Sequence, residues 1–72
     1  MDLNVNDLIT LDDNNEYVIV AKNKYESKMY FYIVDIKDNS NLKFCYLDND
    51  ELVEVNDSEL IKKLLSIFKG MF

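Results

Sequence analysis

Residues 5–55 contain five short runs that are rich in Val, Ile, Tyr, Phe and Leu, the residues typical of β-strands. The runs lie at about 5–11, 16–22, 29–36, 42–47 and 51–55, and the polar clusters DDNN, NKYESK, KDNSN and DND separate them. These clusters are rich in residues that favour turns. Because parallel strands need crossovers of a dozen or more residues, such short connections predict a five-stranded antiparallel meander.

The C-terminal segment changes to a helical period. In NDSELIKKLLSIFKG, five apolar residues recur at helical spacing: Leu60, Ile61, Leu64, Leu65 and Phe68. Charged and polar side chains occupy the opposite side, and Asn56 or Asp57 can cap the start. The pattern predicts one helix over about 57–69. The expected fold is a single mainly β (α+β) domain over residues 1–72, with one C-terminal helix.

Symmetric closure of the predicted turns divides the strand residues between two largely apolar faces. One, which we call the aliphatic face, comprises Ile9, Leu11, Val18, Val20, Phe31, Ile33, Cys45 and Leu47. The other, the tyrosine face, comprises Leu8, Thr10, Tyr17, Ile19, Tyr30, Tyr32, Val34, Phe44, Tyr46, Val53 and Val55. We expect the helix to cover the aliphatic face with Leu60, Leu64, Leu65 and Phe68. The sheet then either curls toward a small SH3-like barrel or offers its tyrosine face to another molecule.

Composition indicates a globular intracellular protein. Of the 72 residues, 49% are hydrophobic, enough for a packed core. The single cysteine, Cys45, cannot form an internal disulfide and suits a reducing compartment. We recognise no signal peptide and no apolar run of the ~20 residues that span a bilayer, so we expect a cytoplasmic location and no membrane partner. Abundant Asn, Lys and Ile without Arg, Pro or Trp suggests AT-rich codons, as in a low-GC bacterium or its phages.

The charge is concentrated in the predicted sheet. Residues 1–56 carry five Lys and twelve Asp or Glu, a net of −7, whereas residues 57–72 carry three Lys and two acids, a net of +1. Phosphate backbones repel such an acidic body, and the chain lacks the arginine that usually reads them. We therefore expect no direct nucleic-acid binding. Solubility is the simplest interpretation of the acidity.

The residues offer little chemistry for catalysis or cofactor binding. There is no histidine, and the only glycine lies at the far end of the chain. Cys45 falls inside an apolar strand, where a thiol is inert. The segment DDNNE begins with oxygen ligands at Asp12, Asn14 and Glu16, but Tyr17 occupies the position where a calcium loop needs glycine, so we interpret it as a hairpin turn. We expect no enzyme activity, no cofactor and no metal, and a cross-strand pair between Asp35 and Lys43.

The tyrosines leave two interpretations open. Tyr17, Tyr30, Tyr32 and Tyr46 share one face in the expected register, and tyrosine is enriched where proteins meet partners. The simpler interpretation is that these rings pack over the domain's own core. As protein-binding residues we nominate Tyr17, Tyr30, Tyr32 and Tyr46, for contact with another protein or for self-association.

As a whole, "ITLDDNNEYVIV…YFYIVDI…NDELVEVNDSELIKKLLSIF" resembles the YrzB-like family of small acidic proteins from low-GC Gram-positive bacteria. The resemblance covers residues 9–68 and rests on the opening hairpin, the tyrosine-containing middle strand and the last hairpin before the helix. The chain departs from it at Asn15, where a turn glycine is usual. The resemblance implies a small β-sheet protein and brings no activity, cofactor or site residue.

Three functions fit these observations. The first is a non-enzymatic cytoplasmic protein-binding module, accessory or inhibitory. The alternative is an acidic phage or mobile-element decoy, whose carboxylates imitate phosphates and block a nucleic-acid-binding site of a host defence or replication enzyme. A third is small-ligand binding in a barrel mouth lined by tyrosines.

Overall fold

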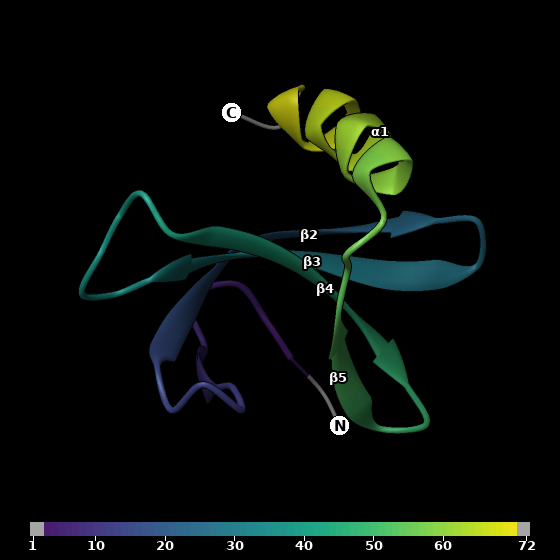
Figure 1. Cartoon of the computed structure of the whole chain (residues 1–72). Coiled ribbons are helices and arrows are strands. Elements are labelled where there is room, and N and C mark those ends of the chain that lie inside the picture. Colours follow the sequence, from purple (N-terminus) through teal and green to yellow (C-terminus); the bar gives the residue numbers. More distant parts are fainter. Residues whose placement is uncertain (1–2, 71–72) are drawn as a thin grey trace.

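The computed structural model describes residues 3–70, which form one antiparallel sheet and one helix (Figure 1). The elements are β1 (Leu8–Thr10), β2 (Glu16–Tyr25), β3 (Lys28–Asp35), β4 (Leu42–Asp48), β5 (Glu51–Glu54) and α1 (Ser58–Lys69). The strands pair in chain order, β1-β2-β3-β4-β5, which confirms the expected meander with a C-terminal helix. Within the described residues, no helix has the length and apolar character needed to cross a membrane.

Two tight hairpin turns give the sheet a strong twist. Glu26 and Ser27 join β2 to β3, and Asn49 and Asp50 join β4 to β5, all four with positive φ (48°, 69°, 50° and 66°). A pair of left-handed residues between antiparallel strands is the type I′ geometry, whose handedness matches the right-handed twist of the strands. The twist allows the five strands to curl rather than lie flat.

An irregularity in β2 decides which side chains share a face. Ile19 pairs with Ile33, but Ala21 pairs with Tyr32, so Val20 is an extra residue between the two pairs. Such a bulge exchanges the faces on either side of it. Tyr17 and Ile19 consequently lie with Phe31, Ile33 and Cys45, and the assignment of Tyr17 and Ile19 to the tyrosine face is wrong.

Helix α1 covers the tyrosine face, not the aliphatic face as we expected. Leu64 and Phe68 are buried there against a cluster that contains Tyr30 and Phe44, with Tyr32 packed at its side. Of the residues expected to face the sheet, Leu65 instead remains half exposed. The helix begins after Asp57, whose side chain accepts a hydrogen bond from the Glu59 amide at 3.0 Å, as an N-cap should.

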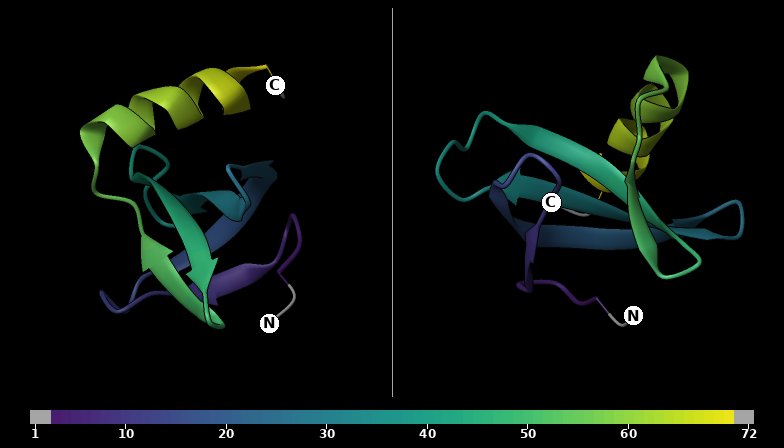
Figure 2. Two further views of the ribbon diagram at one scale, coloured as in Figure 1. Left: turned by 90° about the vertical axis from the view of Figure 1, so that its right-hand side faces the viewer. Right: turned by 60° about the horizontal axis from the view of Figure 1, so that its bottom comes forward.

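The opposite face of the sheet is buried by the sheet itself. It curls so that β1 and β5 swing away from the helix and approach each other, forming a half-barrel (Figure 2). The inner cluster comprises Tyr17, Ile19, Phe31, Ile33 and Cys45, and it is covered by Leu3, Ile9, Leu11, Leu47 and Leu52. One face of the sheet is therefore covered by α1 and the other by the curled sheet itself. The sheet ends at β1 and β5 without closing into a barrel.

Candidate functional site

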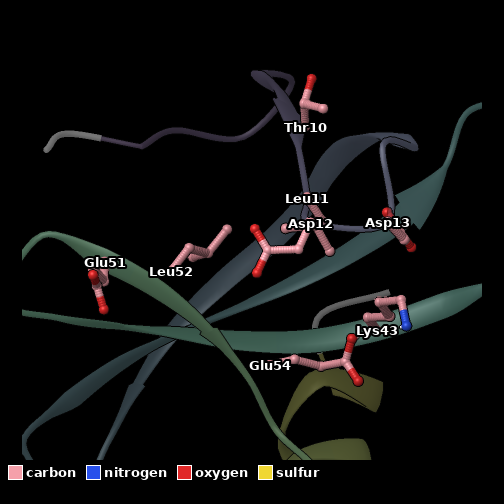
Figure 3. A pocket seen from close by; sticks show the side chains of 8 residues that line it. All are labelled: Thr10, Leu11, Asp12, Asp13, Lys43, Glu51, Leu52 and Glu54. Atoms are coloured by element: carbon pink, nitrogen blue, oxygen red, sulfur yellow. Dashed lines mark ion pairs between the residues drawn. The ribbon is translucent and has the colours of Figure 1, made fainter.

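The unclosed side of the half-barrel contains a cleft of about 570 Å³. One wall is the end of β1 with the β1–β2 turn, and the other is β5 with the neighbouring part of β4 (Figure 3). The cleft is lined by Thr10, Leu11, Asp12, Asp13, Lys43, Glu51, Leu52 and Glu54. Figure 3 shows the Asp12 carboxylate directed into the space between the two walls.

The β1–β2 turn places two carboxylates on the cleft. Asn14 adopts φ 63°, and the Asn14 amide donates to the Leu11 carbonyl at 2.9 Å. Asp13 accepts hydrogen bonds from the Asn15 backbone amide at 3.0 Å, the Asn15 side-chain amide at 3.5 Å and the Tyr17 hydroxyl at 2.7 Å. The hydrogen bond from the Asn15 amide, and next that from Tyr17, lower the pKa of Asp13. This confirms that the segment is a hairpin turn, whose carboxylates also line a cleft.

Tyr17 anchors that turn to the rest of the sheet. Its hydroxyl accepts a hydrogen bond from the Asn41 side chain at 3.1 Å, and the same amide group donates to Asp35 at 3.2 Å. Asp35 is buried and also accepts from the Lys37 amide at 2.9 Å. Burial, and then the bond to Asp13, raise the pKa of Tyr17. The protonated hydroxyl is the donor in the hydrogen bond to Asp13.

An ion pair on the opposite wall joins β4 to β5. The Lys43 ammonium lies 2.8 Å from Oε1 of Glu54, and this hydrogen bond raises the pKa of Lys43. The pair replaces the expected partnership of Asp35 with Lys43, which is wrong because Lys43 lies opposite Ile33. The true register differs from the expected one by two residues, so each β4 side chain still points to the expected face.

The edge of β5 presents backbone groups to the cleft. Val55 donates its amide to the Phe44 carbonyl at 2.8 Å, directly opposite in the β4–β5 register. In an antiparallel pair, directly opposed residues alternate between hydrogen-bonded and non-hydrogen-bonded positions. Val53 therefore also faces β4, whereas the amides and carbonyls of Leu52 and Glu54 point outward. Both residues line the cleft.

The cleft is anionic with an apolar floor. Four carboxylates, Asp12, Asp13, Glu51 and Glu54, face a single ammonium, that of Lys43. Since Lys43 is already paired with Glu54, three carboxylates of the lining are not matched by a cation of the cleft. Leu11 and Leu52 supply the apolar surface between them.

The nominated tyrosines do not form one accessible surface. Tyr17 lies in the inner cluster with an exposed fraction of 0%, and Tyr30 lies under the helix at 5%. Tyr32 and Tyr46 are half-buried; Tyr32 packs edge-on against Phe68, with ring centroids 6.1 Å apart. Tyr17 therefore leaves the face that Tyr30, Tyr32 and Tyr46 still share, and α1 covers part of that face. The nomination of these tyrosines as protein-binding residues stays a prediction.

Other candidate chemistry lies away from the cleft. Cys45 is buried in the inner cluster, and burial raises its thiol pKa to about 12. The described part of the chain contains no group of three or more His, Cys, Asp or Glu side chains placed to hold a metal ion. A second hollow of about 340 Å³ lies between α1 and the sheet, lined in part by Leu42, Ile61 and Leu65.

Sequence reasoning did not identify the cleft. Its walls come from turn 11–15 and from β5, at opposite ends of the meander, and only the curl of the sheet brings them together. The signal in the sequence was the placement of acids at 12–13 and 51–54, both next to leucines that continue the strand pattern. Without knowledge of the curl, these two acidic segments had no reason to be neighbours.

Comparison with protein-family models, with curated proteins and with solved structures finds no match. The resemblance to the YrzB-like family stays a prediction.

Proposed function

We propose that the chain is a small protein-binding module, accessory or inhibitory, and that it holds its partner in the cleft between the β1–β2 turn and β5. The observation that carries this proposal is the open side of the half-barrel, where an outward-facing strand edge, two leucines and unmatched carboxylates lie together. An exposed strand edge is a template for binding another chain. On the other side of the sheet, α1 packs over the helix-covered face.

The charge of the cleft defines the partner surface it favours. Asp12, Asp13 and Glu51 are exposed around the cleft, and complementary charge raises association rates and selects between partners. A partner surface carrying Lys or Arg beside apolar side chains would match this lining. Two copies of the chain would bring the same carboxylates together, which disfavours self-association through the cleft.

Site-specific photo-cross-linking tests the proposal. Benzoylphenylalanine would replace Thr10 in the cleft, Glu26 at the β2–β3 turn, or Leu65 beside the second hollow, in cells that make the protein. We expect one discrete adduct from position 10, without its counterpart from position 26. Equal adducts from positions 10 and 26, an adduct only from position 65, or none above background would contradict the proposal.

A double variant that neutralises carboxylates of the cleft, compared with a control variant, then tests whether the captured partner binds in the cleft. Asp12→Asn combined with Glu51→Gln removes two exposed carboxylates of the lining, and Glu26→Gln, the control, removes one exposed carboxylate at a distant turn. The double variant should bind the identified partner more weakly, while Glu26→Gln should bind as the unaltered protein does. Unchanged affinity of the double variant would separate the partner from the cleft.

The acidic decoy is the second candidate, and the net charge of −7 over residues 1–56 favours it. In that function the carboxylates replace phosphates on a nucleic-acid-binding protein, so binding would be mostly electrostatic. Salt separates the two candidates, because exposed charges are screened within about 10 Å at 0.1 M ionic strength. A decoy would lose most of its affinity as salt rises, whereas a partner held by backbone and apolar contacts would keep much of it.

A further inference from the structure

We infer that the cleft binds an extended segment carrying Lys or Arg, which adds to β5 as a sixth strand. The inference rests on the proposed function and specifies how the partner is recognised. The backbone amides and carbonyls of Leu52 and Glu54 point outward from β5, and both residues also line the cleft. The same stretch of chain can therefore supply both hydrogen bonds and side-chain contacts, which is how strand addition combines affinity with specificity.

The topology favours one direction for the added strand. Five strands paired antiparallel in chain order leave β1 and β5 running in the same sense. The same alternation holds in β1. There the Ile19 amide donates to the Asp7 carbonyl and the Leu11 amide donates to the Asn15 carbonyl, so every second residue from Asp7 to Leu11 faces β2. The backbone amides and carbonyls of Leu8 and Thr10 consequently point away from β2. A segment antiparallel to β5 is antiparallel to β1 as well, so it continues the alternating order of the meander while its hydrogen bonds go to β5 alone.

The lining selects the side chains of that segment. Successive side chains of a strand point to opposite sides, and the cleft offers an apolar floor at Leu11 and Leu52 below carboxylates at Asp12, Asp13 and Glu51. A segment that alternates aliphatic with basic residues matches both. An acidic segment, including the edge of a second copy, would meet like charges.

The test uses a synthetic peptide in which Lys alternates with Val, with blocked ends, added to isotope-labelled protein and followed by NMR. We expect the amide signals of Leu52 and Glu54 to shift in a saturable way. The same peptide with Glu in place of Lys should produce no such shifts. The double variant Asp12→Asn with Glu51→Gln should weaken the binding, and Glu26→Gln should not.

Two N-methylated versions of the peptide isolate the backbone contribution. Each version blocks one alternate set of the peptide's amides, and only one set can face β5. The version methylated on the set that faces β5 should bind at least about tenfold more weakly, whereas the other should bind nearly as well as the parent peptide. Equal binding by both versions, shifts centred on Leu42, Ile61 and Leu65, or no shift at millimolar peptide would overturn strand addition. If the position-10 adduct still forms in such a case, the cleft remains the binding site and only the mode of recognition is wrong.

Discussion

The hydroxyl of Tyr17 donates a 2.7 Å hydrogen bond to Oδ2 of Asp13, four residues earlier in the chain. The bond ties the β1–β2 turn to a side chain buried in the inner cluster, and Asn41 completes the link from the other side of the hydroxyl. It is one of the contacts that hold this wall of the cleft in place.

This relationship predicts how stability depends on acid. The pKa of Asp13 lies below its ordinary value of 3.8, so the folded state favours the ionised form. The resulting stability is present above that value and is lost as pH falls through the lower pKa of the folded protein. Tyr17→Phe should lower the free energy of unfolding at neutral pH and make its acid-side decline shallower. Urea unfolding between pH 7 and pH 2 measures both effects.

Tyr25→Phe is the control, because it also removes a tyrosine hydroxyl, but from a ring packed on the helix-covered face. It should leave the slope of the acid decline unchanged. The same slope in Tyr17→Phe as in the unaltered protein would show that the bond to Asp13 does not bias protonation.

Glu54→Gln should change the titration of Lys43 more than the stability of the fold. The hydrogen bond from Lys43 to Glu54 raises the lysine pKa, so the associated stability is present below the ordinary value of 10.5 and disappears as pH rises above it. With side chains 23% and 40% exposed, the pair should contribute less than about 1 kcal/mol at neutral pH. NMR titration of the lysine side chain should show its pKa fall in the variant; an unchanged pKa would contradict the ion pair.

Tyr32→Ala should destabilise the fold without altering its assembly. The ring lies between Phe44 and Phe68, with centroids 5.2 Å and 6.1 Å away, so its loss leaves a cavity under α1. Because the ring is only half-buried, we expect a cost of about 2–4 kcal/mol. Thermal melts and sedimentation measure the two quantities. A variant that melts normally but sediments as a smaller species would restore the tyrosine face as an assembly surface.

Cys45 should be unreactive toward thiol reagents in the folded protein. Burial raises its pKa to about 12, and the thiolate is the reactive form. At pH 8 we expect labelling by a disulfide reagent to be slow in buffer and fast in denaturant, with a rate that follows unfolding. Rapid labelling under native conditions would contradict the buried position of this residue.

The fold was largely predictable because its strands and turns are encoded locally. Residues 26–27 and 49–50 are polar and tolerate tight turns, and the helical spacing of its apolar residues predicts α1. The face assignment of β2 was not predictable in the same way. Residues 17–21 are continuously apolar, so alternation does not say which side chains point inward, and the bulge at Val20 exchanges the faces.

That exchange also explains the error in placing the helix. Once Tyr17 and Ile19 join the inner cluster, the curled strands bury the aliphatic face among themselves and leave the tyrosine face for α1. The cleft was unpredictable for a related reason. Curl is a property of the whole sheet, and it alone brings Asp12 near Leu52.

The proposed binding site requires the outer edge of β5 to be open in solution, and amide hydrogen exchange of the isolated protein tests this directly. Val53 and Val55 face β4, where the Val55 amide bonds to Phe44, so both should be protected. Leu52 and Glu54 face the cleft and should exchange at least about tenfold faster. This alternation along one short strand is the predicted result. Equal protection of all four amides would mean that another strand already covers the edge, which would contradict the cleft as a binding site.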